Sequence, residues 1–316
     1  MGIELEETRI GPARILFGES RGKYPDANCV VVEGAEERVL LDTTPGLVAR
    51  GRAAAGDVDR ILLTHCHEDH LAGNFLFPEA QVWLHQADLP GIVSVDAMLD
   101  FIYGYTGTRR ARFERQLVDV FHFVPRPDAR AFRGGDVFDL GGGVTVEAVH
   151  TPGHTHGHCA FRIEPEGLLF LGDVDLSSFG PYYGDASSSL EEFEATLERA
   201  AGFEAAHYLS GHHIGLVDPA TYRERLARYT AKLYERDQRL LEYLLEPRTM
   251  DDIVAHRFVY RPQDQVANID ATERVMMGMH LERLLRRGRV EALEAGRFRV
   301  VAGGLAETFG PTGASW

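Results

Sequence analysis

Short apolar runs, each followed by polar or glycine-rich residues, recur from about residue 10 to residue 215. Runs of this length that are rich in β-branched residues and bounded by Gly, Asp or Pro predict strands. We expect strands at residues 13–17, 28–33, 38–42, 60–65 and 81–85, and within 135–150, 158–173 and 205–213. Helical spacing of apolar residues is found at 46–56, 70–77 and 189–202. Strands in runs with helices between them predict two layered sheets with helices outside.

The segment between His85 and Asp136 contains no good strand pattern. Apolar residues at helical spacing predict one helix near 93–105 and a second near 108–121. A connection of this length is typical of a functional lid, so we interpret 85–136 as a helical lid insertion. The second helix carries four arginines, Arg109, Arg110, Arg112 and Arg115. For each of them, we favour the interpretation that it lies on a solvated basic face. The alternative is that it binds an anionic substrate.

The periodicity changes at Pro219, where a long amphipathic helix is predicted over 219–246. A second helix starts after Thr249, which we expect to be its N-cap. A third helix, a turn at Gly288 and a two-stranded hairpin through Gly296 follow. We therefore predict a catalytic domain at 1–218 and a small helical domain at 219–316.

Composition limits the function classes. Hydrophobic residues make up 44% of the chain, as in a globular protein, and the net charge of −15 argues against a nucleic-acid footprint over the whole surface. The region after Pro219 carries a slight excess of Arg, including Arg286, Arg287 and Arg289. No run of eighteen apolar residues occurs, so we expect no membrane segment. The first ten residues include acidic residues where a signal peptide would be basic and then apolar, and the three cysteines show no spacing pattern. We therefore expect a cytoplasmic protein.

The stretch LLTHCHEDHL at 62–71 follows a buried strand. His65 and His67 are two residues apart, so on an extended backbone their side chains share one side while that of Cys66 points away. Asp69 and His70 follow directly and can reach back toward a second position nearby. Imidazoles and a carboxylate suit Zn, Fe or Mn, which makes a metal site the favoured interpretation over a polar loop with coincidental histidines.

Other predicted strands also end in metal-binding residue types. The segment VEAVHTPGHTHGH carries His154, LLFLGD ends in Asp173, and HYLSGHH contains His212. Active sites of layered sheet proteins lie at strand ends, where loops converge without interrupting the ladders. Because several separate strands end in metal-binding residue types, we favour a single metal site to which all of these strand ends contribute.

These motifs, in this order, resemble the metallo-β-lactamase superfamily, in particular its hydroxyacylglutathione hydrolase-like and endoribonuclease groups. The resemblance spans about residues 10–215 and implies an αββα sandwich with a dinuclear site at the sheet edge. It implies that one metal is bound by His65, His67 and His154, that the other is bound by Asp69, His70 and His212, and that Asp173 bridges them. Asp42, in LLDTTPG, would orient the ligand loops. The tail after Pro219 resembles the winged helix of lactamase-like endoribonucleases and related hydrolases, where packing on the catalytic domain is favoured over nucleic-acid binding.

Two divalent cations, with zinc favoured over iron or manganese, can ionise a shared water, and Asp69 is the candidate for steering it or accepting its proton. The expected function is hydrolysis of a small ester, thioester or related small-molecule substrate. A single-strand-specific endoribonuclease and a mononuclear-iron sulfur dioxygenase are the alternatives. A flavo-diiron oxidoreductase is disfavoured because such proteins carry Glu at the position of His67 and a flavin domain, and a non-catalytic DNA-binding role is the least favoured. The sequence does not reveal the substrate or whether the chain forms a homo-oligomer.

The remaining histidines and the tyrosines after Asp173 are assigned lesser roles. We interpret His150 and His156 as loop or substrate-contact residues, His158 as a hydrogen-bonding residue beside the ligands, and His213 as a pocket residue. Tyr182 and Tyr183 either line the pocket or pack. Histidines read as ordinary are His85, His122, His207, His256 and His280.

Overall fold

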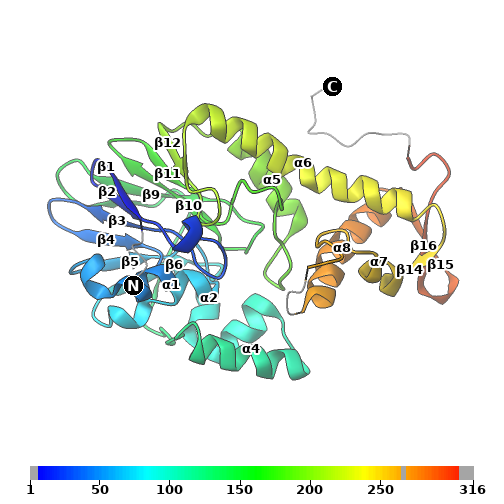
Figure 1. Cartoon of the computed structure of the whole chain (residues 1–316), viewed down its shortest axis with the longest axis horizontal. Coiled ribbons are helices and arrows are strands. Elements are labelled where there is room, and N and C mark those ends of the chain that lie inside the picture. Colours follow the sequence, from blue (N-terminus) through cyan, green and yellow to red (C-terminus); the bar gives the residue numbers. More distant parts are fainter. Residues whose placement is uncertain (1–5, 265–267, 306–316) are drawn as a thin grey trace.

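The computed structural model describes residues 6–264 and 268–305, in which two sheets are stacked between helices (Figure 1). The first sheet has the strand order β1-β2-β3-β4-β5-β6-β7, antiparallel from β1 to β4 and parallel from β4 to β7. Its strands are β1 (Glu7–Ile10), β2 (Ala13–Leu16), β3 (Cys29–Glu33), β4 (Arg38–Leu41), β5 (Arg60–Leu62), β6 (Gln81–His85) and β7 (Arg130–Phe132).

The second sheet has the order β13-β12-β11-β10-β9-β8 and is antiparallel except for the parallel pair β11 and β12. Its strands are β8 (Val137–Asp139), β9 (Thr145–His150), β10 (Cys159–Glu164), β11 (Leu168–Phe170), β12 (His207–Leu209) and β13 (Leu216–Val217). Every strand predicted from the apolar runs is present. The short strands β1, β7 and β13 were not predicted, and β7 corrects the expectation that the lid insertion contains no strand.

The residues of the core between the sheets are set by the alternation of side chains along the strands. In β3, Val30 and Val32 face the second sheet, whereas Cys29 and Val31 face the helices on the outer side. In β10, Phe161 belongs to the core between the sheets, together with residues of both sheets. Side chains alternate across a strand, so a continuous apolar run such as that of β3 is buried on both faces. The two sheets therefore have covered outer faces.

Helices cover those outer faces. On the first sheet lie α1 (Pro45–Arg50) and α2 (Glu68–Leu71), and on the second sheet lie α5 (Leu190–Ala200) and the first half of α6 (Pro219–Tyr243). Thr44 caps α1 and Asp218 caps α6, each followed by a proline at the first helical position, where a missing N–H costs nothing. The arrangement is the αββα sandwich that the sequence predicted (Figure 1).

The lid insertion is mainly helical, as expected. It contains α3 (Val95–Ala97), the π-helical segment Met98–Tyr103 and α4 (Gly107–Asp119), and it packs on the outer core of the first sheet. Arg110 forms ion pairs with Asp96 and Asp100 within the lid, and Arg109 lies over the ring of Tyr105. Two of the four predicted lid arginines thus have partners inside the lid itself.

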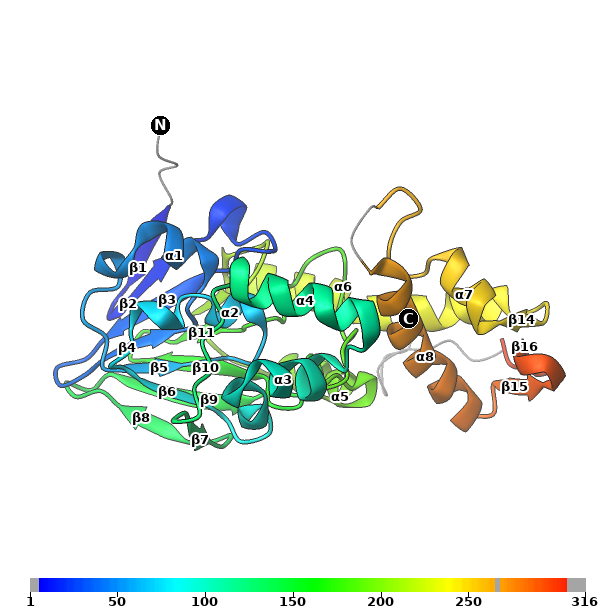
Figure 2. The ribbon, with the colours of Figure 1, turned by 90° about the horizontal axis from the view of Figure 1, so that it is seen from below.

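The C-terminal part forms a second group of helices at one end of the sandwich (Figure 2). It consists of the second half of α6, α7 (Met250–His256), α8 (Ile269–Arg286) and a small sheet of β14 (Arg248–Thr249), β15 (Val290–Leu293) and β16 (Arg297–Val300). Thr249 is the N-cap of α7 in a capping box with Asp252, which confirms that prediction. In the described residues, no helix is long and apolar enough to cross a membrane.

Helix α6 belongs to both parts. Its first half, with Tyr222 and Tyr229, packs on the second sheet, and its second half, with Leu240 and Leu241, packs in the separate core of α7 and α8. The predicted division at 218/219 stays a prediction, and the packing shows that α6 links the two cores.

Replacing Phe161 by Ala tests the core between the sheets. Phe161 is fully buried, so the variant loses the transfer free energy of the ring and leaves a cavity, and we expect the free energy of unfolding to fall by about 3–5 kcal/mol. Denaturant titration measures this change. The control is Phe101→Ala on the lid, where the side chain is 42% exposed and a change of about 0.5 kcal/mol or less is expected. Equal losses in both variants would contradict the packing described above.

Candidate metal centre

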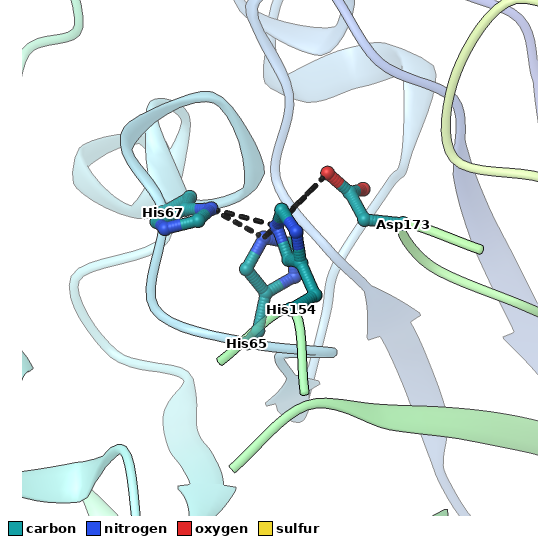
Figure 3. A group of neighbouring side chains, drawn as sticks. All are labelled: His65, His67, His154 and Asp173. Atoms are coloured by element: carbon teal, nitrogen blue, oxygen red, sulfur yellow. Dashed lines mark hydrogen bonds and ion pairs between the residues drawn. The ribbon is translucent and has the colours of Figure 1, made fainter. Parts of the chain in front are cut away.

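Three imidazole nitrogens converge where β5 ends. His65 and His67 follow β5, and His154 comes from the loop after β9 (Figure 3). Nε2 of His65 lies 3.1 Å from Nδ1 of His67 and 3.2 Å from Nε2 of His154, and the last two atoms are 2.9 Å apart. Tetrahedral zinc with Zn–N bonds of about 2.0–2.1 Å separates its nitrogen ligands by about 3.3 Å. The triangle, which we name the first cluster, is close to that size.

A second cluster lies beside the first one. Nε2 of His70 is 3.1 Å from Nε2 of His212, which is 3.2 Å from Oδ2 of Asp69. All three side chains are buried, and their candidate ligand atoms lie within 4.8 Å of one another. His70 and Asp69 come from α2 and His212 from the loop after β12, so this cluster joins the two sheets.

Asp173 reaches both clusters. Its Oδ2 lies 3.2 Å from Nε2 of His154, and its Oδ1 lies 3.0 Å from Nε2 of His70 and 3.4 Å from that of His212. One carboxylate can offer an oxygen to each of two cations. The structure therefore brings together all seven residues predicted as ligands, with Asp173 in the middle.

Glycines allow the ligand loops to take this path. Gly153, just before His154, has φ +129°, and a Cβ there would lie 2.3 Å from the backbone of Phe193 in α5. Gly172, just before Asp173, has φ +53°, and a Cβ there would lie 2.6 Å from Nε2 of His158. A positive φ combined with such close approach admits only glycine without rearrangement. The motifs HTPGH and LGD thus have a steric reason for their glycine.

Hydrogen bonds hold the opposite side of four of the five imidazoles. Nδ1 of His70 contacts the buried Asp42 carboxylate at 2.8 Å, and Nδ1 of His154 contacts the carbonyl oxygen of Tyr182 at 3.0 Å. Nδ1 of His65 contacts Thr64 Oγ1, and Nδ1 of His212 contacts the carbonyls of Gly22 and Asp26. Nε2 of His67 has no hydrogen-bond partner and lies 3.5 Å from Oδ2 of Asp185. Partners of this kind fix the tautomer and the orientation of metal-ligating histidines.

These bonds decide which nitrogens keep a lone pair. Carbonyl and carboxylate oxygens only accept, so the rings of His70, His154 and His212 must donate from Nδ1. Thr64 donates its hydroxyl proton to Asp42 and therefore accepts from His65. In the neutral forms of these four rings, the nitrogens that face the centre are then acceptors, and Oδ1 of Asp173 is buried without a hydrogen bond. Such an arrangement fits cations at its centre.

The shifts in the pKa values of the histidines also support cations at this centre. Burial holds the pKa of His65 and of His67 well below the ordinary value, so both rings are neutral, as metal ligands must be. Burial also opposes a charge on His212, yet the Asp173 carboxylate outweighs it and raises the pKa of that ring well above the ordinary value. The second cluster therefore carries a surplus of negative charge that divalent cations would neutralise.

Three acidic residues near the clusters were missed by the sequence analysis. Asp175 offers an oxygen to a group with Asp173 and His212, and one of its buried oxygens has no hydrogen-bond partner. Glu68 accepts hydrogen bonds from Tyr24 and Tyr103.

Burial and the neighbouring Asp69 raise the pKa of Glu68 to about 7. Asp185 accepts a hydrogen bond from Tyr105 of the lid. The D-x-D spacing after β11 was the signal available for Asp175, whereas no pattern indicated Asp185.

The expectations for the other histidines and for Cys66 were confirmed only in part. Asp173 N donates to Nε2 of the buried His158 at 2.9 Å, as expected of a hydrogen-bonding residue beside the ligands. His150 bonds to the carbonyl of His156 and lies outside both clusters. His213 is exposed with its ring centroid 6.1 Å from that of His212, and its expected role in the pocket or beside the ligands stays a prediction. Cys66 is a buried thiol in the outer core, pointing away from the metals as predicted.

Comparison with known protein families identifies the family of the chain. The profile of the metallo-beta-lactamase superfamily matches residues 25–212, which is more than half of the chain and includes all seven residues of the clusters. The chain belongs to the metallo-beta-lactamase superfamily.

Solved structures of the superfamily share the fold well beyond the matched residues. A metallo-beta-lactamase family protein from Thermus thermophilus has a TM-score of 0.66 at 25% identity, over 95% of this chain and 99% of that one. A beta-lactamase domain protein from Burkholderia ambifaria has the same TM-score at 18% identity, over 94% of each chain, which shows the fold alone. Because both matches cover nearly the whole chain, they include the C-terminal helical region.

Several curated relatives are thioesterases by name. The thioesterase pkgB of Emericella nidulans is 27% identical over 69% of this chain and 54% of its own length. An atrochrysone carboxyl ACP thioesterase of Pseudocercospora fijiensis is 23% identical over 73% of this chain and 60% of its own length. The chain thus spans only a little over half of the length of these relatives.

Replacing Asp42 by Asn tests the support of the second cluster. The variant keeps the size of the side chain and removes the charge that holds Nδ1 of His70, so we expect metal affinity to fall about 10–100-fold. Competition with a chromogenic chelator measures the dissociation constants. Asp59→Asn, which affects an exposed hydrogen bond to Arg38 N, is the control and should bind metal as the wild type does. Unchanged affinity in Asp42→Asn would contradict the role of this carboxylate.

Proposed function

We propose that the chain is a dinuclear metal-dependent hydrolase of small thioesters, esters or related substrates. The observation that supports this proposal most is the pair of clusters that share Asp173, with five imidazole nitrogens that face inward. We propose His65, His67 and His154 as ligands of one ion, Asp69, His70 and His212 as ligands of the other, and Asp173 as the bridge. Zinc suits this set of nitrogen and carboxylate donors best, with iron or manganese as alternatives.

When bound, such a pair of ions would lower the pKa of a shared water toward about 7 and polarise the carbonyl under attack. The protein residues contribute position and proton transfer. Asp69 is almost fully buried, and its Oδ2 lies 3.2 Å from the His212 ring. A carboxylate held there can orient the attacking water and accept its proton, which is the catalytic role we assign to Asp69.

Aromatic side chains border the clusters on the lid side. The ring of Tyr103 stacks on His67 with centroids 5.4 Å apart, and Tyr24, half exposed, meets His212 edge-on at 6.4 Å. Tyr103 and Tyr105 come from the lid, so the lid closes one side of the site. Apolar ring faces beside a metal pair suit an acyl group, and the relatives named as thioesterases support an acyl thioester as the substrate.

Finer assignments rest on the same likeness. We propose a hydroxyacylglutathione hydrolase-like type of active site in a catalytic domain of residues 1–218 with the lid at 85–136, and a winged-helix-like domain at 219–316. The three cysteines are free and buried, which supports a reducing compartment such as the cytoplasm. A small-molecule substrate is the proposed partner, and a homo-oligomer stays a prediction.

The endoribonuclease alternative finds less support. It would draw on the basic residues after α8, yet Arg286 forms an ion pair with Glu191 and Arg287 lies 3.6 Å from Glu194, both in α5. Nε of Arg289 donates to the carbonyl of Gly304. Arg286 and Arg287 thus help to pack the C-terminal part on the sandwich, whereas this bond of Arg289 lies within the C-terminal part. The mononuclear dioxygenase alternative accounts for only one of the two clusters.

Turnover of model substrates tests the proposal. The metal-replete protein should hydrolyse a short-chain acyl thioester of N-acetylcysteamine, with release of the thiol followed by a chromogenic thiol reagent. Asp69→Ala should lower kcat about 10²–10⁴-fold because proton transfer and one ligand are lost. Asp57→Ala is the matched control, since the Asp57 side chain is 99% exposed, and it should leave the rate unchanged.

Other outcomes would point elsewhere. Salt-sensitive cleavage of single-stranded RNA without thioester turnover, lost in an Arg286→Glu, Arg287→Glu variant, would replace the proposal by the nuclease. One iron per chain with oxygen uptake would replace it by the dioxygenase.

A further inference from the structure

The loop between β11 and α5 supplies the hydrogen bond that orients His154. The carbonyl of Tyr182 accepts from Nδ1 of that ring, and thereby leaves Nε2 for the first cluster. The loop has no strand or helix between Phe170 and Leu190, so its own backbone ladder cannot fix this carbonyl. Its position must be set by contacts from outside the loop.

On both sides of Tyr182, such contacts come from the C-terminal helices. Arg236 of α6 donates from Nη2 to the carbonyl of Phe179 at 2.8 Å, and from Nη1 to the carbonyl of Pro181 at 2.7 Å and to Oη of Tyr183 at 2.8 Å. Its acceptors thus stand on both sides of Tyr182. The guanidinium is planar with its donors in a fixed fork, so three simultaneous bonds define where the loop lies.

His280 of α8 completes the clamp. Tyr183 donates its hydroxyl proton to Nε2 of His280 at 2.6 Å, and Nδ1 of His280 donates to Oδ1 of Asp237 at 2.7 Å. Burial lowers the pKa of His280, which agrees with a neutral ring that donates on one side and accepts on the other. The second oxygen of Asp237 receives the Arg283 guanidinium. With Nδ1 of His280 as a donor to Asp237, its 3.3 Å contact with Nη2 of Arg283 is not a hydrogen bond, because both groups donate.

A second contact links α6 to the metal centre. The hydroxyl of Tyr229 donates to the carbonyl oxygen of Asp173 at 3.2 Å. Tyr229 and Arg236 are seven residues apart, two helical turns, so they lie on the same face of α6. One helix face thus holds the backbone of the residue between the clusters and the loop that orients His154.

The degree of burial makes a purely packing role a poor explanation. Arg236, Asp237, His280 and Arg283 are all 3% exposed or less. Burying charged groups costs several kcal/mol per ion unless they are paired, and apolar residues of similar size could pack the same helices at least as stably. What hydrogen bonds add to packing is a defined position for the groups they join. The group defined here is the segment around Tyr182.

We propose that Arg236 and His280, acting through Tyr183, are positioning residues for the metal centre, so that the C-terminal helices set the metal affinity of the first cluster. The inference rests on the proposed metal centre and adds a function for the C-terminal helices within it. The two helices neither touch the ions nor supply ligands. They hold the carbonyl oxygen of Tyr182, which in turn orients the ring of His154.

Tyr183→Phe is the sharpest test because it removes only the hydroxyl that joins Arg236 to His280. The matched control is Tyr222→Phe in α6, whose buried hydroxyl donates to the carbonyl of Ala200 in α5, away from the loop. Tyr183→Phe loses two buried hydrogen bonds and Tyr222→Phe loses one, so thermal stability is measured for both variants beside metal binding. Zinc affinity of the full chain is measured by chelator competition, and the cobalt-loaded proteins are compared by visible absorption.

We expect Tyr183→Phe to weaken zinc binding about tenfold at one of two sites and to shift the cobalt absorption bands, while Tyr222→Phe matches the wild type in both measurements. Wild-type zinc affinity and wild-type cobalt bands in Tyr183→Phe would overturn the proposal. These readouts do not involve turnover, so they are separate from a failure of the hydrolase assignment.

A stronger variant pair covers the case of a small effect. Arg236→Gln removes the fork that holds the loop, and its control Arg239→Gln removes a fork on the same helix that binds the carbonyls of Arg257 and Phe258 instead. Weaker zinc binding in Arg236→Gln alone supports the proposal. Equal zinc affinities in the two variants contradict it.

Discussion

The structure depends on one electrostatic constraint, which is the convergence of five imidazole nitrogens and the Asp173 carboxylate in a buried space. Outward hydrogen bonds to Asp42, Thr64 and backbone carbonyls turn the donor sides of four of these rings away from one another. Their acceptor sides then face inward, where cations can satisfy them. The fold must bring these groups together and keep water and competing donors from relaxing them, which accounts for much of the architecture around the centre.

The sandwich meets this constraint by placing strand ends from both sheets at one edge. His65 and His67 leave the parallel strand β5, Asp173 leaves β11 and His212 leaves β12. The loops can carry polar residues there because no ladder has to continue. The lid adds Tyr103 and Tyr105 on one side, and the C-terminal helices hold the loop after β11 from the other. The centre is thus the common product of the sandwich, the lid and the C-terminal part.

Much of this was readable in the sequence, and the reasons are local. Apolar runs predicted the strands because burial on both faces leaves a continuous pattern, and the cluster at 62–71 predicted ligands because its residues are neighbours along the chain. The role of His280 was not readable. It is one histidine on an amphipathic helix, and its partners Asp237 and Tyr183 are 43 and 97 residues away. Asp185 and β7 were missed for the same reason, since tertiary contacts and not local pattern decide them.

Anomalous X-ray diffraction from crystals of the zinc-loaded protein is the most direct test for a pair of ions at this centre. We expect two anomalous peaks about 3.5–4 Å apart, one coordinated by His65, His67 and His154 and the other by Asp69, His70 and His212, with Asp173 between them. A single peak, or an empty centre in which the imidazoles keep their positions at saturating zinc, would contradict it.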